Sequence, residues 1–251
     1  MASNDKFPEV IVVTPSIGNR TLYDAVTSVK NQNYQDYCHI IFVDGETYKN
    51  EVESVLNDFQ SDKMKIVTLP FNTGSNGFNG HRIYASCAHL LNSKYVFFLD
   101  EDNWYDKNHI KSIIDLIEGE NLDWAHSLRK ICSYDTNFVA YDDCQSLGRW
   151  PPILRPRKFP HFNYPNLVDT SCYGFKTEVL QKVAHFWNHP LGADRIFFKH
   201  ISSVFPYFTS TSEYTLNYRL KEHDISAASY FNMFNSRALI KYNGILPWKG
   251  Q

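Results

Sequence analysis

The sequence predicts an α/β fold in which a mainly parallel sheet is flanked by helices and joined by a smaller antiparallel part. In the first half of the chain, short apolar runs alternate with segments of helical periodicity. Strands that alternate with helices pair in parallel, because each helix carries the chain back across the sheet. The second half contains two neighbouring strand-like runs around a polar turn, which predicts an antiparallel hairpin.

The first strand is expected at residues 10–13, which form a β-branched run. It should end at Thr14-Pro15-Ser16, because proline cannot continue a hydrogen-bonded ladder. We expect Thr21 to cap a helix over residues 22–30, since threonine is favoured at helix N-caps. The chain therefore begins with a strand and a helix.

Three further pairs of a strand and a helix are predicted in the first half. The strands are expected at residues 40–43, 66–69 and 95–99. The helices are indicated by an apolar stripe of Val52, Val55, Leu56 and Phe59, by the segment from His81 to about Leu91, and by Ile110, Ile113, Ile114 and Ile117 at helical spacing. A glycine-rich loop, residues 72–80, precedes the second of these helices.

The second half of the chain has a different pattern. The hairpin is expected to pair residues 124–131 with 138–141, and a proline-rich basic loop follows at 149–158. Thr177 should cap a helix through Ala184, and Gly192-Ala193-Asp194 should lead into a helix through His200. Alternating apolar residues predict a strand over 214–220, and residues 226–251 read as a tail.

Composition excludes several classes of protein. The net charge of −2 over 251 residues provides no basic field for nucleic acid, so any phosphate site must be local. The five cysteines are scattered without a Cys-x-x-Cys pair, which favours reduced thiols over a zinc site. The apolar runs are far shorter than a membrane span requires. A cytoplasmic location is therefore the default expectation.

The residues that follow the strands are the candidates for chemistry, because ligands of open parallel sheets bind beyond the carboxyl ends of the strands. The sharpest of these signals is Asp100-Glu101-Asp102, directly after the fourth predicted strand. Two carboxylates spaced i, i+2 can present oxygens to one hard cation. The triplet alone is equally consistent with a solvated turn that caps the next helix.

The order of these segments resembles nucleotide-sugar-dependent glycosyltransferases of the GT-A fold, and is similar to family 2 enzymes. Four stretches carry the resemblance, which covers roughly residues 8–220: Val10 to Arg20, Ala25 to Tyr34, Ile40 to Gly45, and Asn72-Thr73-Gly74 through Asp102. The last of these resembles the loop, helix and strand that deliver the family's D-x-D metal motif. The sequence departs from the family at Gly80-His81-Arg82, where an Arg-Asn pair is usual.

The resemblance implies a domain over residues 1–225 and a C-terminal tail over 226–251. The nucleotide-binding half would cover about 8–105, and the acceptor-binding half about 106–225. Aromatic and basic residues of the tail either touch a lipid-linked acceptor at a membrane or pack back on the domain. These residues are Tyr230, Phe231, Phe234, Trp248, Lys241 and Lys249.

The resemblance also implies roles for individual residues. Thr14, Pro15 and Asp44 would line the nucleoside pocket. Asp100 and Asp102 would contact the ribose and a diphosphate-bound Mg²⁺ or Mn²⁺, with Asp102 as the metal ligand proper. Arg82 would assist at the diphosphate, and the alternative for Arg82 is an ordinary surface arginine.

Two aspartates and a histidine complete the expected site. An inverting transferase needs a base for the acceptor hydroxyl, and Asp194 occupies the family's position for it, although Ala193 replaces the usual acidic neighbour. Asp194 could instead charge-stabilise the start of its helix. Asp169 is the second candidate base, with a turn-stabilising role as its alternative. His223 is a candidate metal or phosphate ligand, with simple solvation as the more common outcome.

The expected activity is therefore the metal-dependent, inverting transfer of a sugar from a nucleoside diphosphate sugar to a saccharide or other hydroxyl acceptor. The alternative is a non-catalytic relative that only binds sugar nucleotides. Dehydrogenase and P-loop functions are disfavoured, because neither a G-x-G-x-x-G after the first strand nor a G-x-x-x-x-G-K-[ST] is present.

Overall fold

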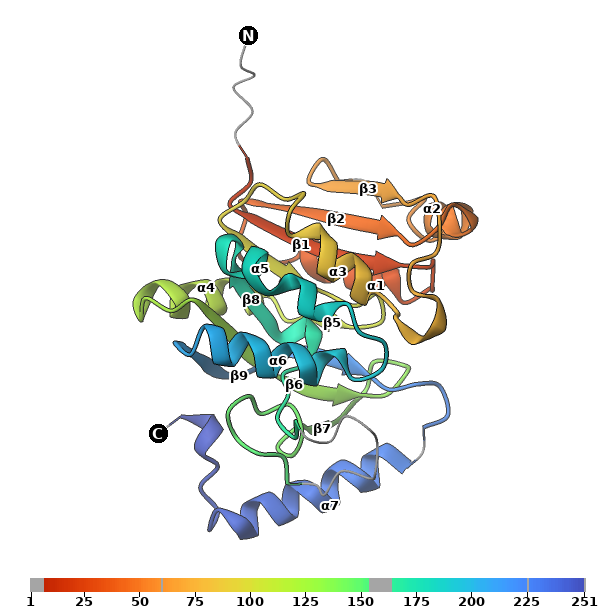
Figure 1. Cartoon of the computed structure of the whole chain (residues 1–251). Helices are drawn as coiled ribbons and strands as arrows, with labels where there is room; N and C mark the ends of the chain where they lie inside the picture. Colours follow the sequence, from red (N-terminus) through yellow and green to blue (C-terminus); the bar gives the residue numbers. More distant parts are fainter. Residues whose placement is uncertain (1–6, 60, 154–163, 225, 251) are drawn as a thin grey trace.

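The computed structural model describes residues 7–59, 61–153, 164–224 and 226–250, and their strands form one nine-stranded sheet (Figure 1). The strands are β1 (Val10–Ser16), β2 (Tyr37–Val43), β3 (Met64–Thr68), β4 (Tyr95–Phe98), β5 (Trp104–Tyr105), β6 (Trp124–Cys132), β7 (Phe138–Tyr141), β8 (Tyr173–Lys176) and β9 (Phe208–Arg219). The α-helices are α1 (Leu22–Lys30), α2 (Lys49–Val55), α3 (His81–Cys87), α4 (His109–Gly119), α5 (Thr177–Val183), α6 (Ala193–Val204) and α7 (Ser226–Lys241).

The sheet has a parallel half and a mixed half. Its strand order is β3-β2-β1-β4-β8-β6-β9-β5, and β7 pairs with β6. The four strands from β3 to β4 are parallel, and β8 is antiparallel to both of its neighbours. The predicted α/β architecture is therefore confirmed. The second half is less simply antiparallel than expected, because β6 and β9 pair in parallel.

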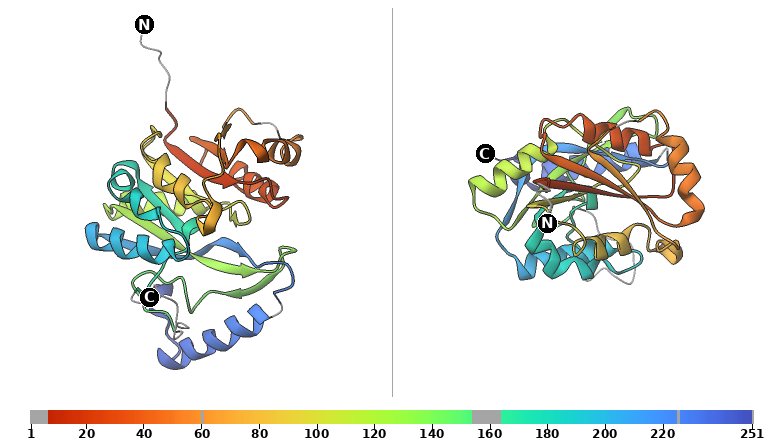
Figure 2. Two further views of the ribbon diagram at one scale, coloured as in Figure 1. Left: turned by 45° about the vertical axis from the view of Figure 1, so that its right-hand side comes forward. Right: turned by 90° about the horizontal axis from the view of Figure 1, so that it is seen from above.

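Helices cover both faces of the sheet. Figure 2 shows α1, α2 and α4 on one side, and α3, α5 and α6 on the other. β1 and β4 are buried along their whole length, as expected for parallel strands covered on both faces. The helices thus leave the carboxyl ends of β1, β2 and β4 as the natural place for a ligand.

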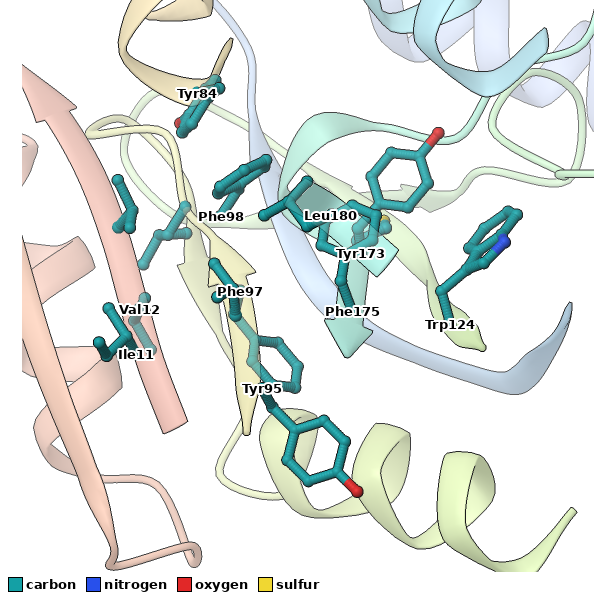
Figure 3. Close-up of a cluster of buried hydrophobic side chains, with 14 of the residues drawn as sticks. Ile11, Val12, Tyr84, Tyr95, Phe97, Phe98, Trp124, Tyr173, Phe175 and Leu180 are labelled. Carbon is teal, nitrogen blue, oxygen red and sulfur yellow. The ribbon is translucent and has the colours of Figure 1, made fainter. Parts of the chain in front are cut away.

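The main core is aromatic and is centred where β4, β8 and β6 lie side by side (Figure 3). Phe98 and Phe175 pack with ring centroids 5.5 Å apart, and both side chains are fully buried. Close packing requires a glycine in β8. A Cβ on Gly174 would lie 2.5 Å from Cγ2 of Ile113 and 2.8 Å from Cε1 of Phe97. Gly174 therefore lets α4 and β4 approach β8 directly.

Several predicted boundaries differ from those of the structure. All four predicted strands of the first half are present, but α3 ends at Cys87 rather than near Leu91. Thr21 lies at the N-cap of α1, yet its side chain makes no capping hydrogen bond. Thr177 is the first residue of α5, so it does not cap that helix. Residues 154–158 of the predicted proline-rich loop lie outside the described residues.

The C-terminal segment contains a helix that was not predicted. α7 packs on β7, with Ala227 and Phe231 in a cluster that includes Ile131 of β6. Trp248, in a short 3₁₀ helix at Pro247–Lys249, is also buried, and its Nε1 donates to Oδ1 of Asp143 over 2.8 Å. Phe231 and Trp248 therefore pack back on the domain.

Among the residues that the structure describes, no helix combines the length and the apolar character needed to cross a bilayer.

Candidate active site

The parallel pairing of β1 with β2 and β4 brings three predicted site segments to one edge of the sheet. Ser16 at the end of β1 is in register with Val43, which precedes Asp44. On the other side of β1, the amide of Leu99 donates to the carbonyl oxygen of Val13 over 3.0 Å. Asp44 and the Asp100-Glu101-Asp102 triplet therefore lie on opposite sides of the carboxyl end of β1.

Asp44 is buried and holds the glycine-rich loop. One carboxylate oxygen, Oδ1, accepts from the amide and from Oγ1 of Thr73, each over 2.7 Å, and Oδ2 accepts from the amide of Gly74 over 2.8 Å. Hydrogen bonds to a charged acceptor are among the stronger ones in proteins. Asp44 therefore fixes the Thr73-Gly74 segment at the edge where a nucleotide was predicted.

Thr14 and Pro15 form the floor beneath this edge. The Thr14 side chain is fully buried, and its Oγ1 is hydrogen-bonded to Nε2 of His39 over 2.9 Å. Burial lowers the pKa of His39 to about 3, so this imidazole is neutral at physiological pH. Pro15 lies against Gly80, where a Cβ would come within 2.6 Å of its Cγ. The first residues of α3 are thereby packed on β1.

Arg82 lies on the exposed face of α3. Its Nη1 donates to the carbonyl oxygen of Thr73 over 3.1 Å, and its guanidinium carbon lies 3.6 Å from the ring centroid of Phe78. The guanidinium of Arg82 therefore lies next to the loop that Asp44 holds. Its expected contact with a diphosphate stays a prediction.

Asp100 and Asp102 have different environments. Oδ1 of Asp100 accepts from Oη of Tyr84 over 2.8 Å, and Oδ2 accepts from Oγ of Ser171 over 3.3 Å. Burial, and then the charges of Asp102 and Asp169, raise the pKa of Asp100 to about 8. The Asp102 side chain is exposed, and its carboxylate accepts no hydrogen bond from another described residue. Asp102 is therefore the freer of the two to bind a ligand.

Asp169 is held in a buried ion pair. Its Oδ2 accepts from Nη1 of Arg129 over 2.6 Å, and its Oδ1 accepts from the amide of Ser171 over 3.0 Å. Nε of Arg129 donates to Oδ2 of Asp142 over 2.7 Å, and all three charged side chains are almost fully buried. The second candidate base is thus already bound to a cation and to the backbone.

Asp194 lies in the first turn of α6. Its Oδ1 accepts from the amide of Arg195 over 2.8 Å. Burial and the charge of Asp169 raise the pKa of Asp194, and Arg195 opposes this rise. His81 is an electrostatic neighbour of Asp194, and its Nδ1 is bonded to the carbonyl oxygen of His189 over 2.8 Å. Since a carbonyl only accepts, the His81 proton lies on Nδ1.

Asp169 connects these carboxylates electrostatically. Burial is the main cause of the raised pKa of Asp100 and of Asp194, and the negative charge of Asp169 raises both pKa values further. The geometry links two of these aspartates directly, because Ser171 donates from its amide to Oδ1 of Asp169 over 3.0 Å and from its hydroxyl to Oδ2 of Asp100 over 3.3 Å. Grouped carboxylates with perturbed pKa values are typical of a functional site.

Arg219, at the end of β9, contacts the segment that carries Asp102, whereas His223, four residues later, is exposed to solvent. Arg219 is buried and donates from Nε to the carbonyl oxygen of Asp102 over 2.8 Å and from Nη2 to Oδ2 of Asp24 over 2.5 Å. Its amide donates to Oδ1 of Asn103 over 3.0 Å. His223 follows in an exposed turn with φ of +66°. The ligand role of His223 stays a prediction.

Comparisons with known proteins agree with this geometry. The sequence model described as "Glycosyl transferase family 2" matches residues 10–184, which span the parallel half of the sheet and the strand end bearing Asp100 and Asp102. The chain belongs to glycosyl transferase family 2. No curated protein sequence matches it.

Two solved structures illustrate the shared fold of this family 2 domain. S. aureus TarS 1–349 matches with a TM-score of 0.61 at 14% identity, over 92% of this chain and 65% of that one. The mannosyltransferase PcManGT from Pyrobaculum calidifontis, in complex with GDP-Man and Mn²⁺, matches with a TM-score of 0.61 at 10% identity, over 97% of this chain and 68% of that one. The family 2 domain thus spans about two thirds of each of these structures.

The chain offers only part of a metal coordination sphere. Within residues 7–59, 61–153, 164–224 and 226–250, no group of three or more His, Cys, Asp or Glu side chains is arranged to hold a metal ion. The unpartnered carboxylate of Asp102 nevertheless fits a hard divalent cation, which prefers oxygen ligands. A cation held there would take its remaining ligands from substrate oxygens and water, as is common for Mg²⁺.

Sequence reasoning missed several residues that build the family 2 site. Arg129 and Arg219 were not singled out, because each lies in a strand and owes its importance to partners far away in sequence. Ser171 was not singled out either, although its hydroxyl donates to Oδ2 of Asp100 over 3.3 Å. Glu101 was visible as the middle residue of the acidic triplet. Its four donors could not be inferred from the triplet itself.

Proposed function

We propose that this chain transfers a sugar from a nucleoside diphosphate sugar to a saccharide or other hydroxyl acceptor, with Mg²⁺ or Mn²⁺ as cofactor and with inversion at the sugar carbon. The observation that carries the proposal is the group formed by Asp100, Asp102, Asp169 and Asp194 beyond the strand ends of a family 2 fold. TarS has been solved in complex with UDP-GlcNAc, and PcManGT in complex with GDP-Man and Mn²⁺. These complexes support a nucleoside diphosphate sugar as the class of donor.

The donor is expected to lie along the ends of β1, β2 and β4. Asp102 and Asp100 would hold the divalent cation, and Arg82, at the start of α3, would face the negative charge of the diphosphate. When bound, the cation stabilises the negative charge that develops on the leaving diphosphate. Asp44 would keep the Thr73-Gly74 loop in place beside the nucleoside.

Asp194 is the better of the two candidate bases. It must accept the proton of the acceptor hydroxyl as the oxygen attacks the sugar, so it needs a free lone pair and a raised pKa. The pKa of Asp194 is raised, and only its Oδ1 accepts a hydrogen bond from a described residue. Asp169 is ion-paired with Arg129, and both of its carboxylate oxygens already accept hydrogen bonds. We therefore assign Asp169 to the support of the site.

The test has a binding arm and a turnover arm. The binding arm measures thermal stabilisation by UDP, GDP, TDP and CMP, each with Mn²⁺ and with EDTA, since a ligand at ~100 times its Kd stabilises by ~2.7 kcal/mol. The turnover arm compares Asp194→Asn with Asp115→Asn, which alters an exposed carboxylate on α4. We expect a metal-dependent shift with one nucleotide that Asp102→Ala abolishes, and loss of transfer only in Asp194→Asn.

Three results would contradict the proposal or a part of it. The absence of a shift with every nucleotide would argue against the donor site as a whole. Nucleotide binding without transfer to any hydroxyl acceptor by the wild-type chain would instead favour the non-catalytic alternative. Full transfer by Asp194→Asn would exclude Asp194 as the base.

A further inference from the structure

The carboxylate of Glu101 is engaged by the loop that follows β1. Its Oε2 accepts from Oγ of Ser16 over 2.5 Å, from the amide of Ile17 over 3.2 Å and from the amide of Asn19 over 3.3 Å. Its Oε1 accepts from Nδ2 of Asn19 over 2.5 Å. Four donors from one short loop therefore converge on a single side chain, and that side chain lies between the two aspartates of the predicted metal motif.

The loop depends on this carboxylate for its conformation. The amide of Gly18 donates to Oγ of Ser16 over 3.0 Å, and Ser16 in turn donates to Glu101. Gly18 adopts a φ of +83°, a backbone region that other residues rarely enter. The amides of residues 17, 18 and 19 are thus satisfied by Glu101 directly or through Ser16. Without the carboxylate, the Ser16 hydroxyl and the amides of residues 17 and 19 lose this acceptor, and Ser16 is no longer held in place to accept from Gly18.

The three acidic side chains consequently have separate tasks. Asp100 is bonded to Tyr84 and Ser171, Asp102 is exposed, and Glu101 is bonded to the β1–α1 loop. The loop lies at the carboxyl end of β1, and its residue Asn19 also accepts from the first amide of α1 through its carbonyl oxygen. Glu101 therefore ties the start of α1 and the end of β1 to the two aspartates.

We propose that Glu101 is a positioning residue that sets the Ser16–Asn19 loop for the nucleoside diphosphate of the donor, an inference that rests on the proposed function. A loop that is already ordered loses less conformational entropy when a ligand binds. Holding the loop in place should therefore lower the Kd for the nucleotide. Glu101 has no contact with the reacting atoms in this scheme. Its removal should weaken donor binding much more than it slows the chemical step.

The experiment compares Glu101→Ala with Glu101→Gln and with Glu118→Ala. Glu118 is the matched control, because it is a hydrogen-bonded carboxylate beside Tyr95 at the opposite end of β4. Amide hydrogen exchange reports loop order at residues 17–19, and titration with UDP and with GDP in Mn²⁺ reports nucleotide affinity. Transfer assays give KM for the donor and kcat separately.

The expected result is a selective loss of loop order and affinity. Glu101→Ala should lose protection at residues 17–19 and should raise the nucleotide Kd and the donor KM by ~10-fold or more, given the strength of hydrogen bonds to a charged group. Its kcat should change by less than ~3-fold. Glu101→Gln keeps an acceptor and should fall between Glu101→Ala and the wild type. Glu118→Ala should behave like the wild type.

Three results would overturn the inference. Unchanged nucleotide affinity in a folded Glu101→Ala would show that the loop needs no such restraint. A loss of Mn²⁺ affinity in the absence of nucleotide would identify Glu101 as a metal ligand instead. Additive effects of Glu101→Ala and Ser16→Ala on affinity would show that the two side chains act independently. Failure of the proposed function is recognised separately, because the wild type would then bind neither nucleotide.

Discussion

Acidification should destabilise this fold through His39, the buried imidazole that supports Thr14 beneath the candidate donor site. His39 lies on β2, which pairs with β1 and β3, and its buried ring has a pKa lowered from 6.5 to about 3 by desolvation. Protonation therefore favours the unfolded chain. The stability that the neutral ring confers is complete above pH 6.5, and it is lost as pH falls from there toward 3.

The size of the effect follows from linkage. At about pH 5, an unfolded histidine of pKa 6.5 is almost fully protonated, and a folded one of pKa near 3 is almost entirely neutral. The difference of ~1.5 units corresponds to a loss of ~2 kcal/mol in the free energy of unfolding. The loss hardly changes if the folded pKa is 4 instead of 3, because the ring would still be mostly neutral at ~pH 5.

A variant isolates this contribution from those of other ionisable groups. His39→Gln keeps a hydrogen-bonding partner for Thr14 but does not titrate. Urea unfolding of both proteins, followed by circular dichroism between about pH 7.5 and pH 5, gives their free energies of unfolding. The wild type should lose ~2 kcal/mol relative to the variant over this range. Parallel pH profiles for the two proteins would refute the assignment of His39 as a buried neutral ring.

Further predictions concern the charged and packed groups around the site. Arg129→Met should destabilise the fold by ~3–5 kcal/mol, measured by urea unfolding, because it leaves buried carboxylates uncompensated. Gly174→Ala should cost ~1–3 kcal/mol in the same assay, since its Cβ would overlap Ile113 and Phe97; a stable variant would show that α4 can move aside. Trp248→Ala should cost ~3–5 kcal/mol, because it empties a buried site and removes a donor to Asp143. A thermal stability equal to that of the wild type would contradict the packing of this C-terminal segment.

Local signals in the sequence were enough to predict the parallel half of the fold. The run at residues 10–13 indicates a strand without any tertiary information. In the same way, the triplet at 100–102 marks the end of another strand, the one predicted at 95–99. The strands β5 and β8 were not predicted, because they contain two and four residues and their pairing partners are distant in sequence. α7 was not predicted because its apolar face is weakly defined, and its residues are ordered by contacts with β7.

The candidate site divides in the same way. Asp44, Asp100 and Asp102 could be found because they directly follow strands of a parallel sheet. Which of Asp169 and Asp194 has a carboxylate free to accept a proton could not be predicted from the sequence. The answer depends on Arg129, a residue of β6 that is 40 positions from Asp169. The resemblance to family 2 ranked the two aspartates. The structure supplies the physical reason, which is that an ion pair occupies one of them.

Arg219 restricts how the two halves of this fold can move relative to each other. It is bonded to α1 through Asp24, to the segment after β4 through Asp102 and Asn103, and to the turn of the β6–β7 hairpin through the carbonyl oxygen of Tyr134. A hinge between the two halves of the sheet would have to break all of these bonds and expose the buried Arg219 side chain. Substrate entry and product release should therefore proceed by movement of the surface loops over a rigid sheet, at rates that small changes in loop sequence can tune.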